Sequence, residues 1–382
     1  MSFLLALPKL SLHGAGAIGD MVKLIAGKKW GKALIVTDGQ LVKMGLLDSL
    51  FTALDAHRLS YQLFDEVFPN PTEALVQQGF AAFKASQCDY LIAFGGGSPI
   101  DTAKAVKILT ANPGPSTAYS GVGHVTHPGV PLVAINTTAG TAAEMTSNAV
   151  IIDSERHVKE VIIDTNIIPD IAVDDASVML DIPASVTAAT GMDALTHAVE
   201  AYVSVGAHPL TDANALEAIR LISQWLPQAV DHGHNLQARE MMAYGQYLAG
   251  MAFNSAGLGL VHALAHQPGA THNLPHGVCN AILLPVIENF NRPKAVTRFA
   301  CIAAAMGVDI HGLNDEQASH KAIEAIRALS ARVGIPSGFA EFGITHADSE
   351  TWLDNALADP CAPCNPRTAS RDEVRALYLE AL

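Results

Sequence analysis

The chain has 382 residues, a length that suits two domains better than one. Of these residues 49% are hydrophobic and only 16% are charged, so the chain can bury a substantial core. Its 23 basic and 37 acidic residues give a formal net charge of −14, which argues against a nucleic-acid-binding protein because such proteins need a basic face. No uninterrupted run of about 18 apolar residues occurs and the start resembles no signal peptide, so we expect neither a membrane span nor a secreted protein.

The first half of the chain alternates short apolar runs with helical patterns. We expect buried strands at residues 32–37, 61–64, 90–94 and 130–135, and the clearest helices between them at 73–86 and 102–110. Strands that alternate with helices at this spacing predict a mostly parallel, Rossmann-like sheet with crossover helices.

From about Pro183 the pattern becomes helical and rich in alanine, with expected helices at 185–203, 209–230, 238–256, 259–270 and 317–333. We therefore predict a dinucleotide-binding α/β domain over residues 1–180 and an all-α, metal-binding domain over 181–382. Ligands of α/β sheets bind beyond the carboxyl ends of the strands, so we expect the site in the cleft between the domains.

A glycine-rich turn follows the expected strand at 90–94. Gly95-Gly96-Gly97-Ser98 precedes a helix, and such glycines let the backbone approach a phosphate while the helix start offers N–H groups. The motif is not the G-x-G-x-x-G fingerprint, and a simple tight turn explains it equally well.

Two further features fit a dinucleotide. Thr137, Thr138 and Thr141 form a second small turn after a strand, and the two turns face one ligand if their strands are neighbours. Asp38 ends the first strand, where a carboxylate could bind ribose hydroxyls and repel the extra phosphate of NADP, which favours NAD. The alternative is that Asp38 only caps a turn or helix.

Two pairs of potential metal ligands lie on apolar helices. Asp193 and His197 are four residues apart, as are His262 and His266, so each pair shares a helix face with Cβ atoms about 6 Å apart. His276 adds an imidazole from an apparent turn. Some pairs arise by chance among 16 histidines, but a buried Asp193 needs a partner, and one carboxylate with several imidazoles suits Fe²⁺ or Zn²⁺.

The segments ATGMDALTHAVEAY, GLVHALAHQPGA and LPHGVCNAILLP, with residues 95–101 and 137–141, closely resemble the iron-containing (group III) alcohol dehydrogenases. The resemblance covers essentially the whole chain and is strongest to the lactaldehyde reductase and short-chain alcohol dehydrogenase branch. It implies a dehydroquinate synthase-like fold, NAD in the cleft, one divalent metal with Fe²⁺ favoured over Zn²⁺, and a homodimer.

The resemblance also assigns residues to roles. The implied metal ligands are Asp193, His197, His262 and His276, and His266 lies near the reacting carbon as the catalytic residue. The implied nucleotide contacts, with Leu180 near the nicotinamide, are Asp38, Asn70, Gly96, Gly97, Ser98, Asp101, Thr137, Thr138, Thr141, Lys159 and Leu180. The variable positions near the substrate are Asn148, Phe253 and His272.

The predicted function is therefore a metal-dependent, NAD-linked alcohol dehydrogenase or aldehyde reductase for small primary alcohols and diols. Two alternatives share the fold: a zinc-dependent polyol dehydrogenase, and a cyclase, which would need a basic pocket that the segments around the metal lack. An alternative from another class is a nucleotide-binding protein without activity, against which the intact ligand types argue.

The remaining cysteines and histidines carry weaker signals. Cys361 and Cys364 form a single C-x-x-C pair, a weak sign of zinc or redox chemistry without a second pair. The scattered, odd number of cysteines favours a reducing cytoplasm. Most other histidines, His157 among them, lie in polar or loop contexts and are not expected in a site.

Overall fold

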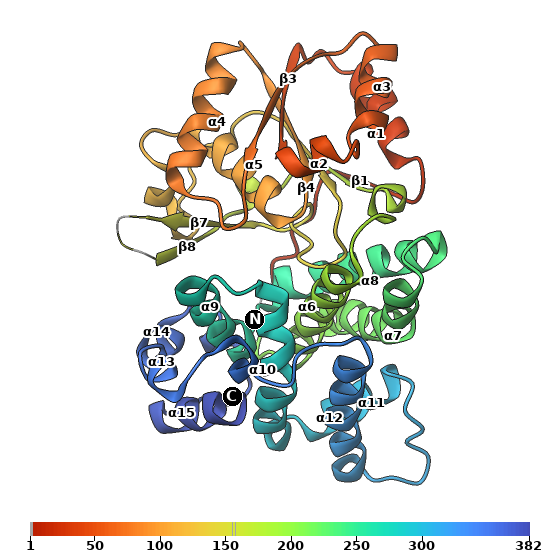
Figure 1. The fold of residues 1–382 in the computed structure, drawn as a ribbon, viewed down its shortest axis with the longest axis vertical. Coiled ribbons are helices and arrows are strands. Elements are labelled where there is room, and N and C mark those ends of the chain that lie inside the picture. The colour runs from red at the N-terminus through yellow and green to blue at the C-terminus, as the bar shows by residue number, and fades with distance from the viewer. Residues whose placement is uncertain (1–2, 155, 157) are drawn as a thin grey trace. The chain divides into compact units, whose positions relative to one another are not determined.

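The computed structural model describes residues 3–154, 156 and 158–382 (Figure 1). The chain forms two compact units. One is an α/β unit of residues 6–138 and 142–180, and the other is a helical unit that contains residues 181–382 together with the short segments 3–5 and 139–141.

The α/β unit is built on a six-stranded sheet with the order β1-β9-β6-β4-β2-β3, in which every neighbouring pair is parallel. Its strands are β1 (Leu10–His13), β2 (Lys32–Asp38), β3 (Ser60–Val67), β4 (Tyr90–Gly95), β6 (Leu132–Asn136) and β9 (Ile171–Asp174). The four strands expected from the sequence correspond to β2, β3, β4 and β6. The expected parallel α/β architecture is confirmed.

Helices cover both faces of this sheet. Successive residues of β2 point to opposite sides, so that Leu34 and Val36 join one core and Ala33 and Ile35 the other. The first core includes α4 (Glu73–Ala85) and α5 (Gly97–Leu109), and the second includes α1 (Ala17–Ala26) and α3 (Asp48–Ala56) (Figure 1). This two-sided burial explains why the strands are continuous apolar runs.

The chain reverses its direction of travel across the sheet between β2 and β4. From β2 it moves to β3 on one side, and then returns past β2 to β4 on the other. The carboxyl ends of β2 and β4 therefore lie at a topological switch point, where open α/β sheets bind ligands.

A second, three-stranded sheet consists of β5 (Gly121–Val122), β8 (Val158–Ile163) and β7 (Asn148–Asp153), with β7 antiparallel to β8. The sequence did not predict it. The buried side chain of Lys104 on α5 ties this sheet to the α/β core: its Nζ donates hydrogen bonds to the backbone carbonyls of Thr146 at 2.9 Å and Asn148 at 2.7 Å. Lys104 thus fixes the start of β7.

The helical unit surrounds α6 (Ala184–Val203), whose residues from Thr187 to Val203 are almost all buried. Its other long helices are α7 (Pro209–Asp231), α8 (Leu236–Ala256), α9 (Leu260–His272), α10 (His276–Asn291), α11 (Val296–Ala305), α12 (Asp315–Arg332) and α15 (Arg371–Glu380). A Cβ at Gly191 would lie 2.3 Å from Leu226 Cδ1, so a larger residue there would have to displace the Leu226 side chain that packs α7 against α6. The expected all-α second half is confirmed.

Shorter elements complete both units. They are the α-helices α2 (Gly39–Lys43), α13 (His346–Glu350) and α14 (Leu353–Ala358), and the 3₁₀ turns η1 (Ser116–Tyr119), η2 (Thr165–Ile167), η3 (Ala176–Met179), η4 (Arg292–Lys294), η5 (Phe339–Phe342) and η6 (Ala362–Cys364). Within the described part of the chain, no single helix is long and apolar enough to cross a membrane, although α8 and α9 pass that test as a pair bent by 105°.

Candidate functional site

Helix α6 supplies one wall of the candidate metal centre. Asp193, His197 and Glu200 follow one another at intervals of four and three residues, so they share one face of the helix. All three are buried, with exposed fractions of 2%, 4% and 1%. Polar side chains buried this deeply need partners, which the neighbouring helices α9 and α10 provide.

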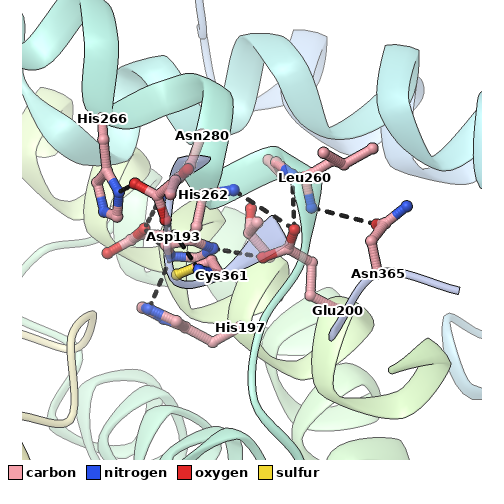
Figure 2. Close-up of polar contacts among 12 residues, drawn as sticks. Asp193, His197, Glu200, Leu260, His262, His266, Asn280, Cys361 and Asn365 are labelled. Atoms are coloured by element: carbon pink, nitrogen blue, oxygen red, sulfur yellow. Dashed lines mark hydrogen bonds and ion pairs between the residues drawn. The ribbon is translucent and has the colours of Figure 1, made fainter. Parts of the chain in front are cut away.

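Four ligand-type side chains gather at this wall, and three of them, Asp193, His197 and His262, are labelled in Figure 2. His262 on α9 places its Nε2 3.0 Å from Nε2 of His197 and 3.9 Å from Oδ1 of Asp193. His276 places its Nε2 3.6 Å from the same Asp193 oxygen. The sequence suggested that His276 comes from a turn, but it is the first residue of α10, directly after Pro275. The expected carboxylate and three imidazoles therefore meet.

Asn280, one turn further along α10, was not recognised from the sequence. Its Nδ2 lies 2.6 Å from Asp193 Oδ1 and 3.1 Å from Nε2 of both His262 and His276. Figure 2 labels Asn280 beside Asp193 and His262. An amide group has two hydrogens, yet three acceptors converge on it, while Asn280 Oδ1 is buried with no hydrogen-bond partner among the described residues. Lone pairs that converge on one point fit a divalent cation at that point.

Glu200 is a second contact that sequence reasoning missed. Its carboxylate accepts hydrogen bonds from the backbone N–H of Val261 at 2.7 Å and of His262 at 3.4 Å, and it also bonds Nδ1 of the His262 ring (Figure 2). A proton on Nδ1 leaves the lone pair of Nε2 directed toward the cluster, as a metal-binding histidine requires. The available signal was a glutamate in an apolar helix, on the face that carries Asp193 and His197.

The charge states of the cluster suit metal ligands. Burial lowers the pKa of both His197 and His262 to about 4, so these rings are neutral near pH 7. Burial works against ionisation of Asp193, but His197, His276 and His262 together hold the pKa of its carboxyl below the usual value. One anionic carboxylate and neutral imidazoles are the forms that bind a cation.

Three further expected residues lie along the helical unit. The Phe253 ring stacks on His197 with centroids 4.4 Å apart, so Phe253 borders the cluster. The His266 ring stacks on His276 at 5.5 Å, and its Nδ1 lies 2.7 Å from Oδ2 of Asp359, a partner that the sequence did not reveal. His272 is exposed instead, and its ring meets the edge of Trp352 at 5.6 Å.

The two turns expected to hold a nucleotide are adjacent in the α/β unit. Strands β4 and β6 are neighbours, Gly95 pairs with Asn136, and the N–H of Thr137 donates to the carbonyl of Gly95 at 3.1 Å. Gly95 has φ 147°, and a Cβ there would lie 2.5 Å from Cγ of Pro99, so only glycine fits. A Cβ at Gly96 would meet Thr138 Oγ1 at 3.0 Å. Gly97 and Ser98 open α5 beside this turn.

Asp38 ends β2 at the switch point and also caps α2. Its Oδ1 accepts hydrogen bonds from the backbone N–H groups of Gln40 at 2.6 Å and Leu41 at 3.2 Å, as the capping alternative proposes. The same carboxylate lines a pocket of about 310 Å³, large enough for part of a nucleotide. The other lining residues are Gly39, Gln40, Lys43, Val67, Phe68 and Pro69.

The remaining expected nucleotide contacts are more dispersed. Asp101 turns inward, where its Oδ2 accepts a hydrogen bond from the N–H of Val150 at 3.1 Å. Asn70 comes directly after Pro69, which lines the pocket at Asp38, and has φ 58°. Lys159 lies in β8. Thr141 groups with the helical unit, and Leu180 is the last residue of the α/β unit. His157 lies outside the described residues.

Comparisons with known proteins identify the family of this chain. Residues 8–176 match the iron-containing alcohol dehydrogenase family, and residues 187–382 match the C-terminal domain of the Fe-containing alcohol dehydrogenase family. The chain is 44% identical to an NAD-dependent methanol dehydrogenase from Bacillus methanolicus, covering 98% of this chain and 99% of that one. It is also 44% identical to the lactaldehyde reductase of Escherichia coli K12, covering 96% of each.

A solved structure shows the same fold. The crystal structure of a 1,3-propanediol oxidoreductase superimposes with a TM-score of 0.98 at 43% identity and covers 100% of both chains. The sheet order, the buried carboxylate–imidazole cluster and these matches lead to one conclusion: the chain belongs to the iron-containing alcohol dehydrogenase family.

Proposed function

We propose that this protein is a metal-dependent, NAD-linked alcohol dehydrogenase that interconverts small primary alcohols or diols and their aldehydes. The observation that carries the proposal is the convergence of Asp193, His262 and His276 on the amide nitrogen of Asn280, beside His197. When bound, a divalent metal would supply Lewis-acid polarisation of the substrate oxygen, and NAD would exchange hydride with the substrate carbon. Three imidazoles and one carboxylate suit Fe²⁺, with Zn²⁺ as the alternative.

The chain's own residues would orient the reactants and move the proton. Asp193, His197, His262 and His276 would hold the metal. His266 donates its Nδ1–H to Asp359, so its Nε2 keeps a lone pair that can accept a proton from the alcohol or return one during reduction. In this proposal residues 1–180 form the dinucleotide-binding domain and residues 181–382 the metal-binding domain.

The nucleotide role rests on the α/β unit. The paired turns at Gly95–Gly97 and Thr137–Thr138 would hold the diphosphate, because the first turn of α5 offers N–H groups at the positive end of the helix dipole. Oδ1 of Asp38 caps α2, and Oδ2 of the same carboxylate would bind the ribose hydroxyls. The methanol dehydrogenase relative is described as NAD-dependent, which supports the same cofactor.

Removal of one ligand tests the proposal. His262→Ala should lose most of the bound metal and nearly all turnover, because one of four inward-facing ligands disappears. His320→Ala, which changes an exposed histidine on α12, is the matched control and should keep both. Metal content by mass spectrometry and NADH formation from C2–C4 alcohols would be measured for protein loaded separately with Fe²⁺ and Zn²⁺. Full metal content with wild-type turnover in His262→Ala would contradict the proposal.

The substrate proposal is a small alcohol that carries a second hydroxyl. Two similar proteins are described as a lactaldehyde reductase and a 1,3-propanediol oxidoreductase. Asn148 is partly exposed at the start of β7. Lys104 donates a hydrogen bond to the backbone carbonyl of Asn148 and not to its side chain, so the side-chain amide could bind a ligand. One such hydrogen bond contributes about 0.5–1.5 kcal/mol, or roughly three- to tenfold in relative kcat/KM. Asn148→Val should reduce the ratio of 1,2-propanediol to 1-propanol turnover by that factor, and an unchanged ratio would remove Asn148 from the substrate site.

We also expect a cytoplasmic homodimer. All five cysteines are free thiols, as in a reducing compartment. Phe3, Leu4, Val205 and Leu210 are exposed apolar residues of the helical unit, and such side chains are common at subunit interfaces. Sedimentation velocity would test this, and a monomer at all accessible concentrations would exclude it.

A further inference from the structure

A second group of ligand-type side chains lies beside the candidate metal centre. His266 comes from α9, Asp359 follows α14, and Cys361 precedes η6. One ring nitrogen, one carboxylate oxygen and one sulfur from these residues all lie within 4.8 Å of one another. The side chains of His266 and Asp359 are only 15% and 8% exposed. The proposed reaction uses His266 but gives no role to the thiol.

The backbone holds this group in place. Asp359 Oδ2 accepts a hydrogen bond from His266 Nδ1 at 2.7 Å, while its Oδ1 accepts one from the backbone N–H of Cys361 at 2.9 Å. The carbonyl of Asp359 accepts a further hydrogen bond from the N–H of Ala362 at 3.1 Å. The tight turn therefore keeps the carboxylate and the thiol near the same face of His266. Figure 2 shows His266 and Cys361 with the main cluster.

We propose that His266, Asp359 and Cys361 form a second cation site that binds a thiophilic divalent ion, foremost Zn²⁺, and thereby inhibits the enzyme. Nitrogen, carboxylate and thiolate ligands with one open position match zinc coordination. Tetrahedral bonds of about 2.0–2.3 Å place ligand atoms roughly 3.3–3.6 Å apart, so the side chains need to move by only about an ångström. The thiolate favours Zn²⁺ over harder ions, and the usual affinity order places Zn²⁺ above Fe²⁺.

Inhibition follows from where the protons go, and this step rests on the function proposed for His266. Zinc binding to the sulfur releases the thiol proton of Cys361 to solvent. When zinc binds Nδ1 of His266, the Nδ1 proton that is hydrogen-bonded to Asp359 leaves to solvent and Nε2 takes one proton up from solvent, so the ring stays neutral with its single proton on Nε2. Nε2 can no longer accept a proton from the alcohol. The ring of His276 stacks on His266 with centroids 5.5 Å apart, so the positive charge of the zinc ion would also lie close to this metal ligand.

Cobalt titration of the chelator-treated protein tests the site without relying on turnover. The main cluster has no sulfur ligand, so a sulfur-to-cobalt charge-transfer band in the near ultraviolet would report only the second site. Wild type should bind two equivalents, with this band. Cys361→Ser should bind one and lose the band, and Asp359→Asn should bind the second equivalent at least tenfold more weakly. Cys364→Ser, the matched thiol three residues further on, should retain the band and both equivalents.

A primary-site variant separates the two proposals. Asp193→Asn should lose the first equivalent of cobalt but keep the sulfur band. In iron-loaded wild type and Cys364→Ser, added Zn²⁺ should inhibit alcohol oxidation, and Cys361→Ser should need at least tenfold more Zn²⁺ for the same fractional loss of its own rate. No sulfur band in wild type, or a band that persists in Cys361→Ser, would overturn the second site. A normal band in a protein without dehydrogenase activity would overturn the proposed function alone.

Discussion

Replacement of Glu200 by glutamine should weaken metal binding without removing a ligand. The carboxylate of Glu200 accepts hydrogen bonds from three donors: the N–H of Val261, the N–H of His262 and Nδ1 of the His262 ring. Glutamine offers one oxygen and one NH₂ group in the same volume. If its oxygen stays with the backbone donors, its NH₂ faces the proton on His262 Nδ1, and two donors meet.

The conflict resolves if the proton of His262 moves to Nε2, the nitrogen that faces Asp193 and His197. That nitrogen then has no lone pair for a metal. A buried donor that is left without an acceptor costs about 1–3 kcal/mol. Outer-sphere partners of metal-binding histidines typically change affinity by about 10- to 100-fold, or roughly 1.4–2.7 kcal/mol. We therefore expect Glu200→Gln to raise the metal dissociation constant by about 10- to 100-fold.

Competition against a metal chelator would measure the dissociation constants of wild type and Glu200→Gln. Glu288→Gln is the matched control, because Glu288 is also fully buried on α10 and contacts Asn291 rather than a ligand. Burial raises the pKa of both Glu288 and Glu200 to about 8, so the control makes the same change of charge as Glu200→Gln. The reasoning is refuted if Glu200→Gln binds metal within twofold of wild type, or if Glu288→Gln weakens binding equally.

Three other predictions concern the choice of cofactor, the choice of metal and the packing of α10 against α6. Asp38→Gly should raise the kcat/KM ratio of NADP to NAD by removing repulsion at the ribose 2′ position, whereas a wild-type preference for NADPH would contradict this role. Activity with Fe²⁺ should exceed that with Zn²⁺, fade in air and return with Fe²⁺ and a reductant; equal, air-stable activity with Zn²⁺ alone would count against it. Gly277→Ala should weaken metal binding and lower the Tm, because a Cβ there would lie 2.4 Å from the carbonyl oxygen of Ala189 on α6. Gly19→Ala, with no atom within 4 Å, is its control, and an unchanged Tm and metal affinity in Gly277→Ala would be the contrary result.

Local sequence patterns determined much of the protein. The apolar runs at β2, β4 and β6 are continuous because both sheet faces are covered, and that pattern is visible without a structure. The i, i+4 pairs Asp193 with His197 and His262 with His266 are visible for a similar reason, since helical spacing alone places such residues on one face. Strands β1 and β9 were missed because each has only four residues, too few for a reliable periodic signal.

Tertiary structure alone decided which distant groups meet. Asn280 reaches Asp193 across 87 residues, and Asp359 reaches His266 across 93. No local pattern distinguishes these side chains from other polar residues in helices and turns. The packing of α6, α9 and α10 brings them together, and burial then makes each one require its partner, because an isolated charge or amide is costly away from water. The carboxylate and imidazole ligands can therefore be recognised from the sequence. Asn280 and Asp359, which contact these ligands and His266, can be recognised only from the packed helices.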